Sequence, residues 1–265
     1  MTKNTSYEKV GADRPSEWLV LCDHATNIVP ADVAGGDLGL PAEDMDRHIA
    51  WDPGARGVSL ALAEALNAPY IGSRFSRLVI DPNRGETDPT VLMKLYDGSI
   101  IPGNRDADAA EKERRLDAFH RPYHEAITKH LNDAAANGAA PCLVSVHSYT
   151  PQLKNRPIRP WQIGLLWDKD DRMLRPLLTR LQAEPDLCVG DNEPYNGALA
   201  DDCMFQHGTS RGLMHILIEI RNDLIADAET QAQWGVDLAR WLTEARAEVD
   251  EGTRHGHGHR RTNAA

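Results

Sequence analysis

The stretch WLVLCDHATN, residues 18–27, starts like a buried β-strand and ends in groups that resist burial. Five apolar or thiol residues at 18–22 are typical of a strand that is covered on both faces. Asp23 and His24 follow directly, although a carboxylate or an imidazole is costly to bury without a partner. In open α/β sheets, ligand sites lie beyond the carboxyl ends of strands, so this junction indicates both a fold and a place for function.

Apolar runs of the same kind alternate with helix-like segments along the chain. Further strands are predicted at 70–72, 77–81, 142–146, 162–167, 187–189 and 214–220, and helices at about 42–50, 53–66, 107–136, 171–183 and 225–250. Asp52 is a plausible N-cap of the second helix, and Pro53 suits its first turn. This alternation predicts an α/β protein with a mixed, largely parallel sheet and helices on both faces.

Polar side chains recur where these strands end. Four predicted strands lead into or carry such groups near their ends: Asp23 with His24, Asn83 with Arg84, His147, and Glu219 with Arg221. Because the carboxyl ends of parallel strands meet at one edge, we expect these groups to converge. Each has a plain alternative, since a histidine at a strand end can be purely structural and Glu219 with Arg221 can be a solvated ion pair.

Composition narrows the class of protein. The chain has 265 residues and a formal net charge of −11, with a pI near 5.4. This acidity argues against nucleic acid or an anionic membrane as the main partner. We find neither a signal peptide nor an apolar run long enough for a membrane span, and the four cysteines form no Cys-x-x-Cys pair. These features predict a cytoplasmic protein with buried free thiols.

The chain shows no internal repeat and no long linker, so residues 1–250 are predicted to form a single domain. Residues 251–265 are rich in glycine and histidine and are expected to be a disordered tail. His120 and His124 lie four apart on a predicted helix and could chelate a metal, but packing or an indirect role is favoured. Motifs for nucleotide binding or serine-based acyl chemistry are missing from the sequence.

The assembled residues resemble the N-formylglutamate amidohydrolase family from about residue 18 to residue 237. The stretches that carry the resemblance are CDHATN, HIAWDPGA, SRLVIDPNRGE, IPGNR, PYHEAI, VSVHSYTP, RPWQIGLLW, VGDNEPYNG and IEIRNDLI. That family is similar in fold to the zinc carboxypeptidases and to aspartoacylase-like deacylases. The resemblance therefore implies a zinc ion held by two histidines and a carboxylate, with a separate glutamate as base.

Carried over residue by residue, the resemblance makes His24 and His147 the metal-binding histidines. Carboxypeptidases have a glutamate three positions after the first histidine, but Asn27 stands there and is a poor ligand. Asp52 is the preferred carboxylate ligand, with a simple N-cap role as an equal alternative. His48 and Asp46 are further alternatives for this ligand.

The resemblance also implies roles in the reaction. The resemblance makes Glu219 the base. From the chemistry of the residues themselves, Arg221 would stabilise the oxyanion and Asp23 would orient the ring of His24. The substrate residues would be Asn83 and Arg84 for one carboxylate, Arg159 or Arg77 for the second, and Tyr195 in a mobile flap, with a purely structural turn as an equal alternative for Tyr195.

The expected activity is hydrolysis of N-formyl-L-glutamate to formate and L-glutamate, as in histidine catabolism. The expected cofactor is zinc, with Mn, Co or Fe also compatible with a carboxylate-rich site. One alternative is a zinc amidohydrolase that acts on another N-acyl amino acid or a small peptide. A different class, a non-catalytic protein that binds an acidic metabolite or a metal, is the other alternative.

Overall fold

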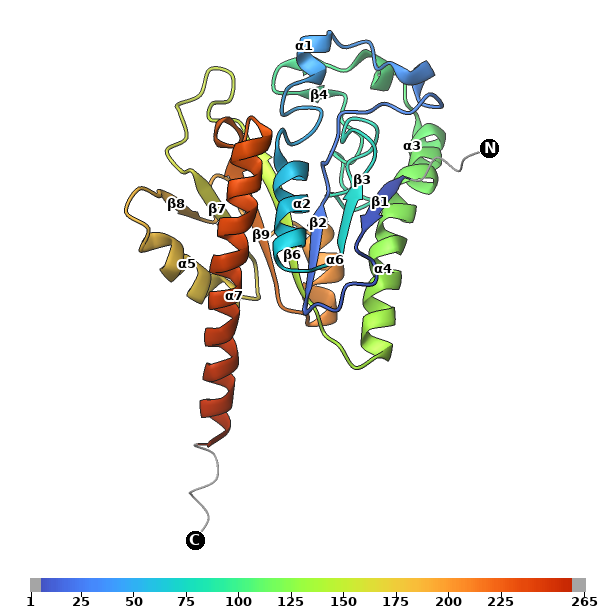
Figure 1. Cartoon of the computed structure of the whole chain (residues 1–265). Helices are drawn as coiled ribbons and strands as arrows, with labels where there is room; N and C mark the ends of the chain where they lie inside the picture. Colours follow the sequence, from blue (N-terminus) through green and yellow to red (C-terminus); the bar gives the residue numbers. More distant parts are fainter. Residues whose placement is uncertain (1–5, 259–265) are drawn as a thin grey trace.

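A seven-stranded mixed sheet lies at the centre of the chain (Figure 1). The computed structural model describes residues 6–258, with side chains described up to residue 251. The strand order is β1-β3-β2-β6-β9-β7-β8. The strands are β1 (Tyr7–Val10), β2 (Trp18–Cys22), β3 (Tyr70–Ser73), β6 (Cys142–Tyr149), β7 (Ile163–Leu166), β8 (Val189–Asp191) and β9 (His215–Arg221).

The sheet is largely parallel at its centre and antiparallel toward both edges. Strands β3, β2, β6 and β9 run parallel to one another. β1 runs antiparallel to β3, while β7 runs antiparallel to β9 and parallel to β8. The predicted mixed, largely parallel sheet is confirmed.

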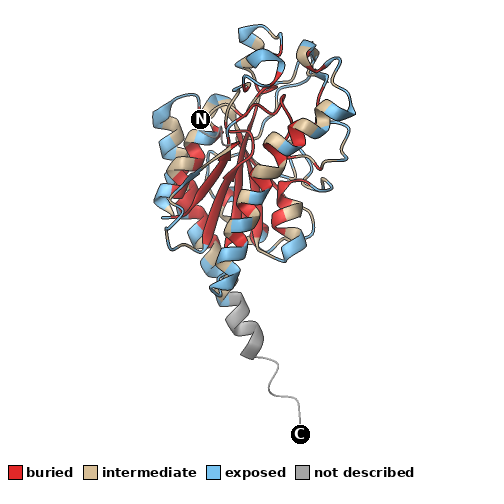
Figure 2. Cartoon of the chain, turned by 90° about the vertical axis from the view of Figure 1, so that its right-hand side faces the viewer, coloured by how far each residue is buried: buried red, intermediate tan, exposed pale blue. Residues whose placement is uncertain are grey.

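Helices cover both faces of the sheet, as predicted. Helices α2 (Ala55–Ala65), α5 (Leu174–Gln182) and α7 (Ala228–Gly258) pack on one face, and α4 (Arg121–Ala136) and α6 (Cys203–His207) on the other. In Figure 2 the buried strands lie between helices whose outer surfaces are exposed. Successive side chains of β9 point to opposite faces of the sheet. Ile216, Ile218 and Ile220 pack in the cluster under α2 and α7, whereas Leu217 packs in the cluster under α4.

The predicted strand at 77–81 is wrong. Leu78 and Val79 lie in a turn, which Ile80 follows, and the backbone N–H of Val79 donates to the carbonyl of Ser76 at 2.9 Å. The run is apolar because a second hydrophobic cluster buries it, and not because it belongs to the sheet. That cluster is closed by the long connection that contains β4 (Leu95–Tyr96), β5 (Ser99–Ile100) and α3 (Ala109–Arg115).

Two predicted helices are shorter or interrupted. The helix expected at 42–50 is limited to α1 (Ala42–Met45). The one expected at 107–136 consists of α3, a π-helical turn at Leu116–His120, and α4. Pro122 lies in the first turn of α4, and because proline lacks an N–H and crowds the preceding turn, a regular helix cannot run through this point.

The predicted tail begins inside a helix in the structure. Helix α7 reaches Gly258, and residues 259–265 lie outside the described residues. The boundary at residue 250 and the disorder of the tail therefore stay predictions.

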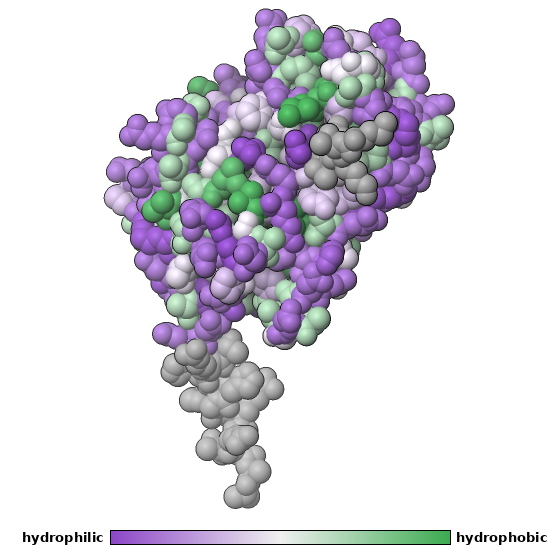
Figure 3. All heavy atoms as spheres, turned by 45° about the vertical axis from the view of Figure 1, so that its right-hand side comes forward, coloured by the Kyte–Doolittle hydropathy of each residue, from purple (hydrophilic) through white to green (hydrophobic). Residues whose placement is uncertain are grey.

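The surface is mainly polar on the face shown in Figure 3, where apolar atoms form small separate patches. No helix among residues 6–258 is long and apolar enough to cross a membrane. Cys22, Cys142 and Cys203 are buried free thiols, as predicted, whereas Cys188 is free but exposed.

Candidate active site

Two neighbouring parallel strands bring His147 and Glu219 together. β6 continues past its predicted end to Tyr149, so His147 lies inside the strand and is paired in register with Glu219 of β9. Residues paired in this way point to the same side of a sheet. His24 follows β2, the other neighbour of β6, so the predicted polar edge exists.

His24, Asp52 and His147 form a buried group around one carboxylate oxygen. Asp52 Oδ2 lies 2.8 Å from His147 Nδ1 and 3.2 Å from His24 Nδ1. One donor atom from each of the three side chains lies within 4.8 Å of the other two. Two imidazole nitrogens and a carboxylate oxygen are a common donor set for catalytic zinc, so these three residues fit a divalent metal.

Asp52 does not cap helix α2 through its side chain. The helix begins at Ala55, after Gly54 in a left-handed conformation with φ of 82°, and no side chain accepts a capping hydrogen bond there. The backbone N–H of Asp52 instead donates to the carbonyl of His24 at 3.0 Å. This contact holds the two residues side by side and leaves the Asp52 carboxylate to face the histidines.

A further carboxylate stands behind each histidine. Asp81 Oδ1 lies 2.7 Å from His24 Nε2, and Asp23 Oδ2 lies 3.0 Å from His147 Nε2. The prediction that Asp23 orients His24 is therefore wrong, because β2 turns Asp23 toward the neighbouring strand β6. A carboxylate on the far nitrogen fixes the tautomer and orientation of a metal-binding imidazole, so both rings are set to offer Nδ1.

The group is strongly charged despite its burial. Burial alone raises the pKa of Asp52, but the two histidines outweigh it and hold that pKa well below its ordinary value. Burial alone lowers the pKa of His147, but Asp23 and Asp52 raise it well above its ordinary value. Asp52 is therefore ionised at neutral pH, and the carboxylates favour a positive charge beside them. A divalent cation would satisfy that preference in place of a proton on His147.

A cavity of about 370 Å³ lies over this group. It brings together most of the residues predicted for the site: His24, His48, Asp52, Arg77, Asn83, Arg84, His147, Tyr195 and Glu219. Glu219 is 7% exposed, and its Oε2 has no hydrogen-bond partner among the described residues. Burial raises the pKa of Glu219 to about 7. A solvated ion pair with Arg221 is thereby excluded for this carboxylate.

A sequence profile of the N-formylglutamate amidohydrolases matches residues 16–226, which is most of the chain. The chain belongs to the N-formylglutamate amidohydrolase family. A gene product of Agrobacterium tumefaciens with a known crystal structure is 32% identical at a TM-score of 0.88, over 94% of this chain and 97% of that chain. No curated protein sequence matches the chain.

A second solved structure has the same fold as the present chain. It is an N-formylglutamate amidohydrolase from Ralstonia eutropha, which is 22% identical at a TM-score of 0.65, over 95% of this chain and 99% of that chain. The fold predicted from the resemblance to the N-formylglutamate amidohydrolases is therefore confirmed across nearly the whole chain.

Two arginines predicted for the amidohydrolase site lie outside its cavity. Arg221 stands at the end of β9, where its Nε donates to Asp223 Oδ1 at 2.8 Å. Arg159 donates from Nη1 to the hydroxyl of Tyr195 at 3.0 Å, and its guanidinium stacks over that ring. Arg221 is thus not placed for an oxyanion, and Arg159 does not line the cavity but stacks on Tyr149 and Tyr195, which do.

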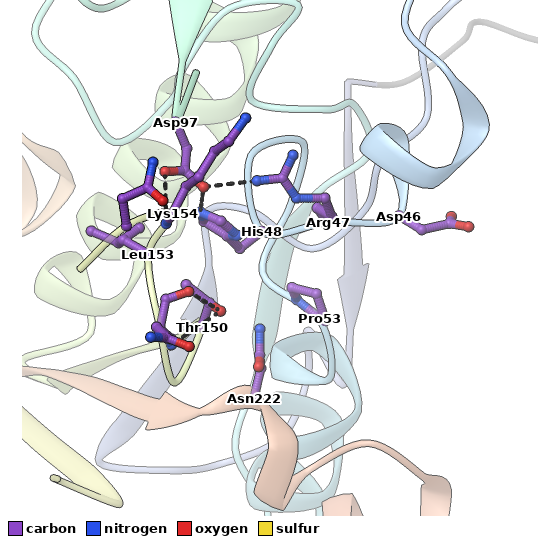
Figure 4. Close-up of a pocket in the computed structure, with 11 residues that line it drawn as sticks. Asp46, Arg47, His48, Pro53, Asp97, Thr150, Leu153, Lys154 and Asn222 are labelled. Atoms are coloured by element: carbon purple, nitrogen blue, oxygen red, sulfur yellow. Dashed lines mark hydrogen bonds and ion pairs between the residues drawn. The ribbon is translucent and has the colours of Figure 1, made fainter. Parts of the chain in front are cut away.

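The alternative ligands His48 and Asp46 are not part of the group formed by His24, Asp52 and His147. They line a second, more open cavity of about 790 Å³ (Figure 4), where Asp46 points away from the other side chains. Nε2 of His48 lies 3.5 Å from Asp97 Oδ2. Because His48 lines both cavities, it stands between the inner site and this outer one.

Asp81, which holds His24, was not predicted from the sequence, and Arg77 lines the cavity but is also paired with two carboxylates. The Arg77 guanidinium donates to Asp81 Oδ2 at 2.8 Å and lies 3.4 Å from Asp52 Oδ1. A signal for Asp81 was present, because it ends an apolar run just as Asp23 does. Asp202, at the start of α6, also lines the amidohydrolase cavity and had no comparable signal.

Proposed function

We propose that this protein hydrolyses N-formyl-L-glutamate to formate and L-glutamate, with Glu219 as general base and a divalent metal held by His24, Asp52 and His147. Family membership supports an amidohydrolase. The observation that carries the mechanism is the buried Glu219 carboxylate, which faces the same cavity as the two histidines and Asp52.

Zinc is the proposed metal, with Mn, Co or Fe as alternatives, because the group offers two nitrogens and one carboxylate. When bound, such an ion supplies a water of lowered pKa and polarises the formyl carbonyl. Asp81 and Asp23 keep both rings in the tautomer that presents Nδ1 to the ion.

Glu219 performs the proton transfers. Its carboxylate accepts a proton from the attacking water as the water oxygen forms a bond to the formyl carbon. It then donates that proton to the amide nitrogen as the C–N bond breaks, so formate and the free amine of glutamate leave. A base whose pKa lies near neutrality can do both, because it accepts and releases a proton at similar cost.

Cations in the cavity match an anionic substrate. Among the described residues no carboxylate forms an ion pair with Arg84, whose Nη1 donates only to the carbonyl of Asn83 at 2.8 Å. Its guanidinium is therefore the best-placed clamp for a substrate carboxylate. Arg77 is already shared between Asp52 and Asp81, so we assign it, in place of Arg221, to stabilising charge beside the metal-binding group.

The test is a paired measurement on one purified sample: bound metal by elemental analysis, and release of glutamate from N-formyl-L-glutamate. We expect metal in the sample and turnover that a chelator abolishes. Metal without turnover would reject the substrate and keep the site. Neither metal nor turnover would reject the mechanism and favour a non-catalytic binding protein.

Replacement of Arg84 should mainly weaken substrate binding. We expect Arg84→Gln to raise KM by roughly 10–100-fold, since a hydrogen bond to a charged group contributes about 1.5–3 kcal/mol. Steady-state kinetics would measure this, with the exposed Arg105→Gln as a matched control. An unchanged KM would remove Arg84 from the substrate site.

The pH dependence of kcat/KM should show the ionisation of Glu219. The protein's own groups raise its pKa from 4.5 to about 7, mainly through burial, and a nearby divalent cation would lower it by favouring the carboxylate. Because only the carboxylate can act as base, kcat/KM should fall tenfold per pH unit below an inflection between these two values. A profile that rises toward acid would contradict this role.

A second candidate substrate class is larger N-acyl amino acids or small peptides. The inner cavity is near the lower end of typical ligand sites, which span roughly 300–1,000 Å³, and so suits an amino-acid derivative. The outer cavity beyond His48, however, offers room for a longer acyl group. Comparing kcat/KM for N-formyl- and N-succinyl-glutamate would decide between them.

A further inference from the structure

Helices α4 and α6 place three metal-binding side chains together on the face of the sheet away from α2 and α7. His124 comes from α4, while Cys203 and His207 lie one turn apart on α6. All three are buried, and one donor atom from each lies within 4.8 Å of the other two. None of them belongs to the group of His24, Asp52 and His147.

Hydrogen bonds fix the orientation of these rings. His124 Nε2 lies 2.9 Å from the carbonyl oxygen of Pro82, and a carbonyl only accepts, so this nitrogen carries the proton. His124 Nδ1 therefore presents its lone pair, 2.8 Å from Nε2 of His207. A ring that donates its far N–H to a backbone carbonyl has the usual arrangement of a metal-binding histidine.

One ring nitrogen of this cluster is buried without a hydrogen-bond partner in the part of the chain that the structure describes. Nδ1 of His207 is buried and has no hydrogen-bond partner among the described residues. A buried polar atom without a partner is costly, so its retention calls for a reason. A surface cleft of about 390 Å³ reaches the same two histidines and gives a cation a way in; it is lined by Glu125 and by Glu86, which is paired with Arg121.

We propose that His124, Cys203 and His207 form a second metal site, for a borderline or soft divalent ion such as Zn²⁺. Two imidazole nitrogens and one thiolate suit this class of ion, and a water could complete the coordination. Binding would release one proton, from the Cys203 thiol, because both rings are neutral and the proton on His207 Nε2 would move to Nδ1 of the same ring. Zn–N bonds of about 2.0–2.1 Å at a tetrahedral angle hold nitrogens roughly 3.3 Å apart, so the rings need to separate by about half an ångström.

The site would be coupled to the catalytic one through the chain. His124 holds the carbonyl of Pro82, and the N–H of Cys203 donates to Asn83 Oδ1 at 3.2 Å. Both contacts fix the segment that carries Arg84. The role of this second ion is therefore to clamp α4, α6 and the substrate-binding segment together, which does not depend on the identity of the substrate.

Cobalt distinguishes the two sites because only one contains sulfur. The full chain is stripped with a chelator and titrated with Co²⁺ while near-ultraviolet absorption is recorded. We expect a thiolate-to-cobalt charge-transfer band that saturates with one ion per chain. The histidines at 255, 257 and 259 can bind cobalt but cannot give this band, since the tail has no cysteine.

Variants assign the band. Cys203→Ser should abolish it and lower bound cobalt by one ion per chain, and His207→Gln should weaken it. Cys142→Ala and Cys188→Ser, which change a buried and an exposed thiol outside the cluster, should leave it unchanged. Absence of the band in the unmodified chain, or its survival in Cys203→Ser, overturns the proposal. The unmodified chain decides the matter even if a variant does not fold.

Discussion

Glu219→Gln is expected to lower kcat by about 10²–10⁴-fold, the range typical of general acid–base catalysis. The amide has nearly the shape of the carboxylate but cannot accept a proton from water. Glu219 Oε2 forms no hydrogen bond within the described part of the chain, so the substitution breaks no such contact at that atom. The loss should therefore appear in turnover rather than in folding. Stopped assays of glutamate release would measure it.

Two further readouts separate a catalytic role from a structural one. Bound metal and KM should change little in Glu219→Gln, because the metal-binding group and Arg84 remain intact. The acid inflection of kcat/KM should also disappear, since the titrating base is gone. Glu229→Gln, an exposed change at the start of α7, is the matched control and should match the unmodified enzyme. Retained turnover in Glu219→Gln would assign the proton transfers to another group.

Burial patterns explain why the sheet was predictable from sequence. β2 and β9 are covered on both faces, so their apolar runs are nearly continuous and stand out from the helices between them. The run at 77–81 looks the same, but the second hydrophobic cluster buries it as a turn. Hydrophobicity indicates whether a segment is buried, but not which backbone groups it hydrogen-bonds to. A single sequence therefore cannot distinguish a buried strand from a buried turn.

The residues of the candidate site also differ in how far the sequence predicts their positions. His24, His147 and Glu219 follow or belong to core strands. Because the carboxyl ends of parallel strands meet at one edge of the sheet, the sequence predicts that these three residues lie together. Asp52 was predicted as a ligand through the family resemblance, and Asp81 ends an apolar run, but the contacts of both depend on how two irregular segments fold back, which no local pattern encodes. Arg221 shows the converse error, because it shares a strand face with Glu219 yet lies beyond the cavity, where Asp223 pairs with it.

These irregular segments carry the charges that hold the histidines. The carboxylates of Asp52 and Asp81 both contact the ring of His24, and the guanidinium of Arg77 forms ion pairs with both carboxylates. Buried charges are tolerated only when each has close partners, so the cluster is built as a network rather than as separate pairs. Substitutions within the network should therefore weaken metal binding more, the closer they lie to the three proposed ligands, His24, Asp52 and His147.

Asp52→Asn should have the largest effect on metal content. Oδ2 of Asp52 is the oxygen that both Nδ1 atoms approach, and an amide supplies no negative charge there. Loss of a carboxylate behind a metal-binding histidine typically costs 10–100-fold in affinity or activity. Loss of the ligand itself should cost more, so we expect more than about 100-fold weaker metal binding and a matching loss of turnover.

A graded series tests this assignment. Asp81→Asn removes the partner of His24 Nε2 and should weaken metal binding by about 10–100-fold, less than Asp52→Asn. Asp97→Asn, which changes a carboxylate of the outer cavity beside His48, should leave metal affinity unchanged. Competition with a chelator of known affinity would rank the three. If Asp97→Asn proved the most damaging, the ion would lie toward His48, and the ligand set would have to be redrawn around that histidine.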